Sequence, residues 1–244
     1  MGKFGKWIGG GLGWAVGGPI GAIFGFVVGS IIDGNTTDLQ TGRTTGYSGR
    51  TTAGGYVMSL LVLVAAVMKA DGKVLKSELD YVKRFMVQNF GEASAAEAIK
   101  LLRDLLKQNI PVNEVSRQIR QNMNYSARLQ LLHFLFGIAN ADGHVEDTER
   151  RLIENIAKEM GIGNSDFESI QAMFVRNVDA DYKILEIEPT ASNEDLKKAY
   201  RRMAMKFHPD KVSHLGEDFQ KAAKDKFQAV NQAYENIKKE RKIA

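Results

Sequence analysis

The chain has 244 residues, of which 44% are hydrophobic and 25% charged, so it can bury a core and is long enough for more than one domain. Its net charge of +4 is too small to indicate a nucleic-acid-binding protein by itself. It contains no cysteine, which excludes disulfides and thiol chemistry and fits a reducing compartment.

The first element is a stretch from Trp7 to Ile32 without a charged residue. A helix needs about 20 apolar residues to span a bilayer, so we predict a single transmembrane helix within residues 1–34. A stripe of glycines lets a second helix approach closely, which predicts a homodimer through this anchor. A loosely inserted segment or a short helical hairpin is the alternative. The stripe consists of Gly9, Gly13, Gly17, Gly21, Gly25 and Gly29.

Residues 35–55 are rich in threonine, glycine and serine and predict a flexible tether. From 56 to 176 the apolar residues recur with a helical period, which predicts an all-α domain of seven helices. The expected helices span 56–69, 76–90, 94–107, 111–122, 126–140, 147–160 and 165–175.

This helical region contains an internal repeat. Asp71-Gly72 is followed by Glu78, and Asp142-Gly143 is followed by Glu149 at the same spacing. The glycine can take a left-handed conformation after one helix, and the glutamate can accept from free amides at the start of the next. We therefore expect each copy to be a capped helix–turn–helix.

On this Asp-Gly-x-Val-x-x-x-Glu pattern the region resembles the TerB domain, an all-helical fold named for tellurite resistance. The resemblance suggests metal binding by Asp71, Glu78, Asp142 and Glu149. Calcium takes six to eight oxygen ligands, and each copy offers few acids, so we favour capping over a metal site. We find no zinc-ligand spacing and no pairing of a nucleophile with a base, and we expect neither enzymatic activity nor a cofactor.

Residues 179–244 predict a helical hairpin with His208-Pro209-Asp210 at its tip. The proline disfavours helix in the residue before it, so the first helix should end near Phe207. Ser192 or Asn193 can cap that helix, and a polar turn is expected at 212–217. Only the short segment 176–179 joins this hairpin to the preceding region, which restricts their relative motion.

The hairpin resembles the J-domain of DnaJ-type co-chaperones. The matching segments are Asp181-Tyr182-Lys183-Ile184-Leu185, Leu196-Lys197-Lys198-Ala199-Tyr200-Arg201, His208-Pro209-Asp210-Lys211, Lys226-Phe227 and Ala233-Tyr234-Glu235. The resemblance implies that a DnaK-type ATPase chaperone binds this face and hydrolyses ATP faster. The implied contact residues are His208, Pro209, Asp210, Lys197, Lys198, Tyr200, Arg201, Arg202, Lys206 and Lys211.

Anchor, TerB-like region and J-like hairpin in this order resemble the DjlA type of membrane-anchored DnaJ-like protein. That resemblance implies a co-chaperone for unfolded or stress-related clients at a bacterial inner membrane. Loop charges do not fix the orientation, but a cytosolic chaperone partner would place both domains in the cytoplasm. The alternative is a metal-responsive or scaffolding TerB-like module with an accessory J-domain. The basic helix lacks interleaved aromatic residues, so we expect no nucleic-acid partner.

Overall fold

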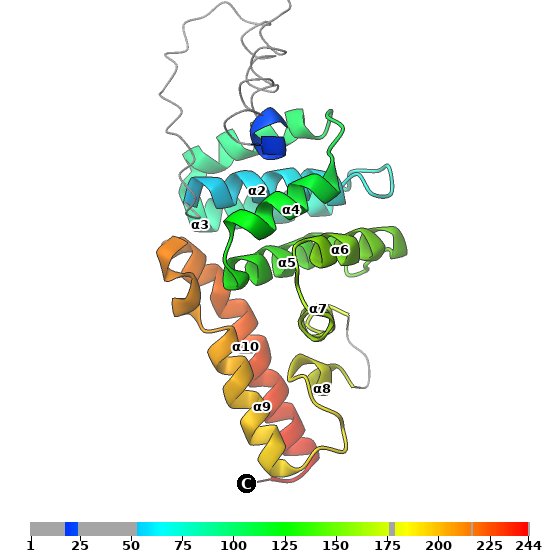
Figure 1. Ribbon diagram of the computed structural model, residues 1–244, viewed down its shortest axis with the longest axis vertical. Coiled ribbons are helices and arrows are strands. Elements are labelled where there is room, and N and C mark those ends of the chain that lie inside the picture. Colours follow the sequence, from blue (N-terminus) through cyan, green and yellow to red (C-terminus); the bar gives the residue numbers. More distant parts are fainter. Residues whose placement is uncertain (1–17, 24–52, 176–178, 216, 244) are drawn as a thin grey trace, which may run out of the picture.

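The computed structural model describes residues 18–23, 53–175, 179–215 and 217–243. Within these ranges the regular structure is entirely helical, with no strand, which confirms the all-α prediction for this part of the chain (Figure 1). The helices are α2 (Ala53–Val67), α3 (Lys76–Leu105), α4 (Val112–Asn122), α5 (Tyr125–Ala139), α6 (Asp147–Glu159), α7 (Asn164–Ala172), α8 (Ala180–Ile184), α9 (Asn193–Lys206) and α10 (Glu217–Glu240), with a 3₁₀ helix, η1 (Pro209–Leu215).

The TerB-like region is built around α2 and α5. Residues 60–67 of α2 are buried on every side, and most of α5 from Ala127 to Ala139 is buried as well. A helix that is apolar all round belongs in the middle of a bundle. The amphipathic helices α4 and α6 cover this centre, each burying one face and leaving the other in solvent.

The predicted helix positions agree with the observed ones to within a few residues at most ends. The two predicted helices 76–90 and 94–107 correspond to α3, which is interrupted at Gly91. The backbone angles of this residue, φ 77° and ψ 167°, are not helical and suit glycine alone.

The J-like region is an antiparallel pair, α9 and α10, with η1 at the tip and α8 packed alongside (Figure 1). Ser192 caps α9 by accepting from the amide of Asp195, and α9 ends immediately before Phe207, as predicted. The predicted polar turn is wrong in part, because residues up to Leu215 form η1. Val212 in η1 is buried, and packing of this side chain into the core accounts for an ordered 3₁₀ helix in place of a polar turn.

The short helical segment 18–23 lies against α4. Its buried residues are Ile20 and Ile23, and the backbone amide of Ile20 donates to Oε1 of Gln118 at 2.9 Å. In the described part of the chain, no helix has the length and apolar character needed to cross a bilayer. The predicted transmembrane helix lies largely outside the described residues. So do Gly9, Gly13, Gly17, Gly25 and Gly29 of the glycine stripe, and Gly21 falls in the described segment.

Candidate functional site

The tripeptide His208-Pro209-Asp210 follows α9, and its last two residues begin η1. Phe207, which precedes the tripeptide, is buried and fixes the end of α9 in the core. The side chains of His208 and Asp210 are 49% and 77% exposed, so the tip is presented to solvent.

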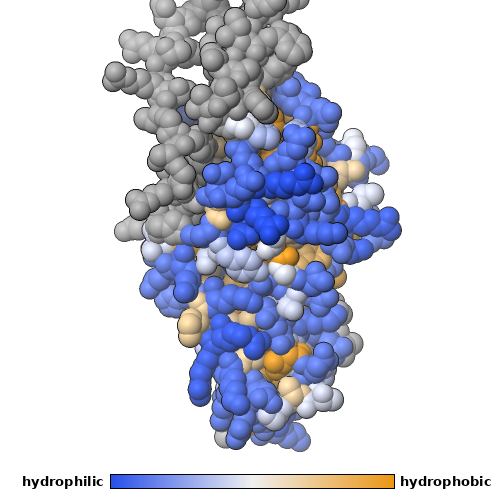
Figure 2. Space-filling model, in the orientation of Figure 1, coloured by the Kyte–Doolittle hydropathy of each residue, from blue (hydrophilic) through white to orange (hydrophobic). Residues whose placement is uncertain are grey.

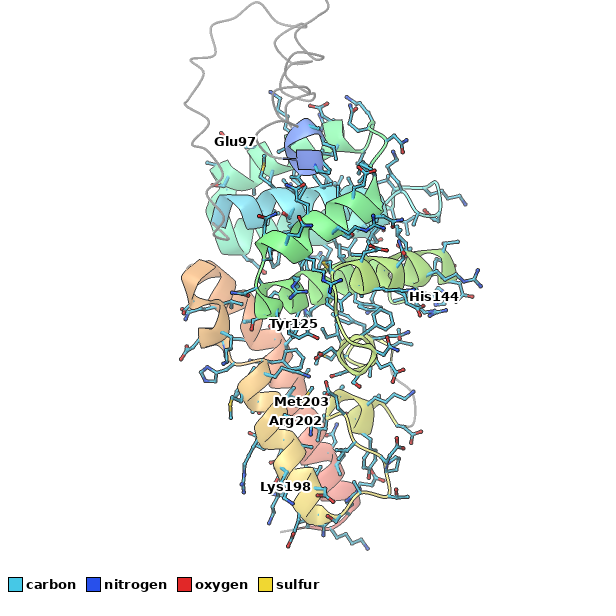
Figure 3. The ribbon with its side chains drawn as sticks, viewed as in Figure 1. Glu97, Tyr125, His144, Lys198, Arg202 and Met203 are labelled. Carbon is cyan, nitrogen blue, oxygen red and sulfur yellow. The ribbon has the colours of Figure 1, made fainter. Side chains whose placement is uncertain are left out.

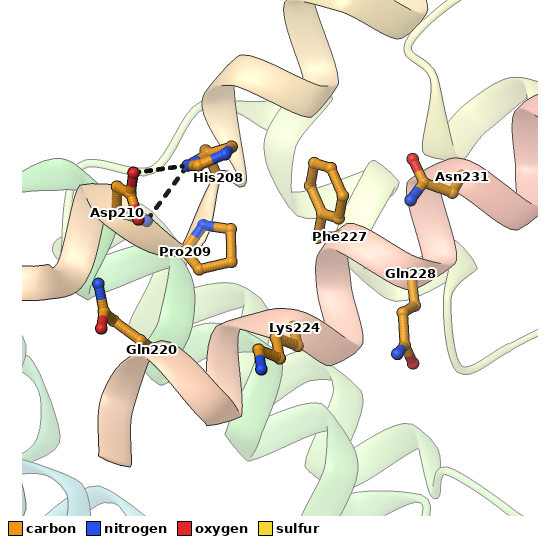
Figure 4. A pocket seen from close by; sticks show the side chains of 8 residues that line it. All are labelled: His208, Pro209, Asp210, Gln220, Lys224, Phe227, Gln228 and Asn231. Atoms are coloured by element: carbon orange, nitrogen blue, oxygen red, sulfur yellow. Dashed lines mark hydrogen bonds and ion pairs between the residues drawn. The ribbon is translucent and has the colours of Figure 1, made fainter. Parts of the chain in front are cut away.

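Within the turn, Nδ1 of His208 accepts from the backbone amide of Asp210 at 3.3 Å and lies 3.5 Å from Oδ2 of the same residue (Figure 4). An imidazole nitrogen accepts a hydrogen bond only when it carries no proton, and pairs with a carboxylate only when it does. The two contacts are therefore alternatives at the same nitrogen, and either one holds the histidine and the aspartate together.

Two open grooves flank the tip. One, of about 540 Å³, runs from the turn along α10, and the other, of about 590 Å³, lies toward α9. Phe227 lines both, and its ring meets His208 edge-on with the ring centres 5.8 Å apart. Met205, which lines the second groove, is 65% exposed. Figure 4 shows the lining of the first groove, which consists of His208, Pro209, Asp210, Gln220, Lys224, Phe227, Gln228 and Asn231.

Sequence patterns had not singled out Met205 and Phe227 as contact residues. Phe227 was assigned to the apolar stripe of its helix, and it is only partly buried. Met205 is a large apolar residue off the buried stripe of α9, and that position is the signal that could have found it. Exposed apolar side chains beside polar ones are typical of a protein contact surface.

The predicted basic residues of α9 separate into two groups. Lys197, Lys198 and Arg201 are exposed, as is Lys211 after the tip. Tyr200 stacks on Tyr234 and donates a hydrogen bond to Asn231. Most of the visible surface here is hydrophilic (Figure 2), and Lys198 lies near the far end of α9 (Figure 3).

The other two basic residues bond to segments outside α9, although the side chain of Arg202 is still 51% exposed. Arg202 donates to the backbone carbonyls of Leu185 and Glu186. Lys206 lies 2.7 Å from Glu186 and 2.7 Å from Asp166, which belongs to the TerB-like region. Lys206 therefore points away from the open side of α9, and we assign it to the contact between the two regions instead of to the partner-binding face.

The two Asp-Gly turns have the predicted capping geometry. Gly72 and Gly143 have φ of 80° and 93°, the left-handed conformation expected of them. The carboxylate of Glu78 accepts from the amide of Leu75 at 2.8 Å. In the second copy the carboxylate of Glu149 accepts from the amide of Glu146 at 3.1 Å, so the capping prediction is confirmed in both.

The structure also brings the two copies together. The buried carboxyls of Glu78 and Glu149 share a hydrogen bond, and Asp71 and Asp142 lie close enough to act on Glu78 electrostatically. Burial is the main cause that raises the pKa of Glu149 to about 7 and also raises that of Glu78. One carboxyl can donate to the other only when it is protonated. Across the described residues, no three acidic or histidine side chains form a group suited to hold a metal ion.

Comparisons with known proteins divide the chain into the same three parts as the sequence analysis: an amino-terminal segment, a TerB-like domain and a J-domain. Residues 1–50 match the family model of the co-chaperone DjlA transmembrane domain, 58–172 that of the tellurite resistance protein TerB, and 181–244 that of the DnaJ domain. No solved structure shows a significant match.

Two curated DjlA relatives match over most of their length. The co-chaperone protein DjlA of Coxiella burnetii is 26% identical over 200 residues, covering 72% of this chain and 74% of that protein. The protein of the same name from Vibrio vulnificus is 27% identical over 228 residues, covering 76% and 78%. The chaperone protein DnaJ of Fusobacterium nucleatum is 46% identical over 54 residues, which are 22% of this chain and 14% of that one.

The DnaJ match thus covers the hairpin that carries the exposed tripeptide, and the TerB match covers the domain with the paired Asp-Gly turns. Both occur in the same order behind a DjlA-type amino-terminal segment. The chain has the three-part organisation of the DjlA type of DnaJ-like proteins, with a TerB-like domain followed by a carboxy-terminal J-domain.

Proposed function

We propose that this protein is a co-chaperone that recruits a DnaK-type ATPase chaperone to the membrane and accelerates ATP hydrolysis by that partner. The observation that carries the proposal is the exposure of His208-Pro209-Asp210 at the tip of the J-domain hairpin, next to open grooves and exposed cations. The relatives that share this architecture are named co-chaperones.

The docking face combines charge with apolar contact. Lys197, Lys198 and Arg201 would steer the J-domain toward an acidic surface of the chaperone, which raises the association rate. The exposed Met205 and the partly buried Phe227 would then be covered by the partner, which holds the complex together. Pro209 fixes the shape of the turn, and His208 and Asp210 contact the chaperone directly. The energy comes from the partner's ATP, so the J-domain needs no catalytic group.

The amino-terminal segment would anchor the protein in the inner membrane, with the TerB-like domain and the J-domain in the cytoplasm. The match of residues 1–50 to a transmembrane family model supports the anchor. We propose that the TerB-like domain selects clients or senses stress. Because the chain has no cysteine, a single cysteine at the exposed Glu194 tests the orientation. It should react with an impermeant maleimide in inverted membrane vesicles and stay unlabelled in intact spheroplasts.

The central experiment is single-turnover ATP hydrolysis by a cognate DnaK-type chaperone in the presence of the full-length protein. We expect acceleration by the wild type and none by His208→Gln. The matched control is His144→Gln, which removes an exposed histidine in the second Asp-Gly turn. Acceleration by both variants would refute the role of the tip, and absence of acceleration by the wild type would refute the co-chaperone function.

A further inference from the structure

The TerB-like domain and the J-domain share a contact in which buried polar groups are matched. In Figure 1, α7 lies between the rest of the TerB-like bundle and α8 of the J-domain. The hydroxyl of Ser169 on α7 donates to the carbonyl of Ile184 on α8 at 2.8 Å, and both residues are buried. A buried carbonyl without a partner is costly, so this bond depends on the two domains staying in register.

Asp166, also on α7, provides the charged part of the contact. It is 7% exposed, lies 2.7 Å from Nζ of Lys206 on the J-domain and accepts from the hydroxyl of Tyr125. Burial alone would lower the pKa of Lys206, but its bonds to Asp166 and Glu186 outweigh burial and raise that pKa. The lysine is therefore charged, and its charge is balanced across the domain boundary.

Lys226 on α10 is a second J-domain lysine turned toward the TerB-like domain. It is only 1% exposed, and its ammonium lies 5.2 Å from the centre of the Phe207 ring. Burial lowers the pKa of Lys226, and the charge of Asp166 opposes that change. The pKa of His133 on the TerB-like domain is also lowered, mainly by burial and further by the charge of Lys226. In an isolated hairpin, a lysine side chain would extend until its amine reached water. In this structure Asp166 and His133 of the TerB-like domain lie near the amine of Lys226, and the lysine is buried.

The opposite requirement, an open partner-binding face, is met at the same time. The side chains of His208, Asp210 and Lys198 are 49%, 77% and 70% exposed. The contact with the TerB-like domain thus uses J-domain lysines that lie apart from the exposed cations and the grooves.

We propose that the TerB-like domain is a docking platform for its own J-domain, in which Asp166 receives Lys206 and holds the tripeptide in an outward orientation. The partner that fits this surface is the side of the J-domain that carries Lys206, with the buried Lys226 beside it. The platform makes the two domains one rigid unit, so that anything bound to the TerB-like domain keeps a fixed distance from the tripeptide.

The test measures the distance between the domains in the full-length protein by electron–electron double resonance. The absence of native cysteine allows spin labels at two introduced cysteines, Asp147→Cys on α6 and Glu194→Cys on α9, which replace exposed residues. We expect one narrow distance distribution for the otherwise unchanged protein, loss of the narrow peak for Asp166→Lys, and no change for Glu168→Lys. Glu168 lies on the same helix but is exposed, so it is the matched control.

The charge swap separates loss of docking from loss of folding. Lys206→Glu should also abolish the narrow peak. The double variant Asp166→Lys plus Lys206→Glu should restore it, because the lysine at position 166 then lies beside two carboxylates, the introduced one at position 206 and that of Glu186. A broad distribution in the protein with the native interface would overturn the proposal, as would a narrow peak that survives Asp166→Lys. No chaperone is present in this measurement, so its outcome is independent of the proposed co-chaperone function.

Discussion

The buried pair of glutamates in the Asp-Gly turns should make the stability of the TerB-like domain depend on pH. The pKa of Glu149 lies at about 7 against a usual 4.5, with burial as the main cause. Between these pH values the folded state keeps a proton that the unfolded state has released. The free energy of unfolding therefore falls as the pH rises from about 4.5 to about 7.

The magnitude follows from the pKa values. Each pH unit corresponds to 1.36 kcal/mol, so ionising Glu149 in the folded state costs up to about 3 kcal/mol above pH 7. The variant Glu149→Gln cannot ionise, yet its amide oxygen can still accept from the amide of Glu146 and cap α6. We expect the variant to match the wild type near pH 5 and to exceed it by about 2–3 kcal/mol at pH 8.

Denaturant unfolding at several pH values measures the difference between the two proteins, with Glu97→Gln as a control at an exposed carboxylate on α3. A difference that does not change with pH would refute the reasoning. The same series in calcium tests the metal alternative. If calcium stabilises the wild type at pH 8 and Asp71→Ala plus Asp142→Ala abolishes this effect, the acids form a cation site in addition to their caps.

Three further outcomes can be checked directly. In the ATPase assay, Arg201→Ala should reduce stimulation, because this side chain is exposed on the proposed docking face, whereas Glu168→Lys, at an exposed position of the TerB-like domain, should leave it unchanged. Lys226→Met should raise the free energy of unfolding by about 1–3 kcal/mol, since it removes a buried amine and keeps the apolar stem. Gly17→Ile plus Gly21→Ile should abolish self-association in a transmembrane reporter assay, and an unchanged signal would exclude the glycine stripe as the dimer interface.

Local sequence signals were sufficient for the helices and their ends. Apolar periodicity located the elements of both domains, and Pro209 predicted where α9 ends. Gly72 and Gly143 predicted left-handed turns, and Glu78 and Glu149 predicted caps. Each of these features depends on residues within a few positions of one another, so a short stretch of sequence is enough to predict it.

Features that depend on distant residues were not predictable in the same way. The internal repeat suggested two similar turns but not that Glu78 and Glu149 would touch. Val212 looked like part of a polar turn because its burial depends on residues outside its own segment. Lys206 looked like one more cation on a basic helix, and nothing near Asp166 in the sequence identifies it as its partner 40 positions away.

The division of the J-domain cations gives a physical reason for joining it to a TerB-like domain over so short a segment. A free J-domain exposes lysines on all sides, and a charged chaperone surface could attract several of them. Here Asp166 and Glu186 neutralise Lys206, and burial takes Lys226 out of solvent. Exposed cations remain along α9 and beside the tripeptide, and also at Lys183 on α8 and Lys239 near the end of α10. In the proposed docking the TerB-like domain covers the side of the J-domain that carries Lys206 and Lys226, so a chaperone meets the domain from the sides that stay in solvent.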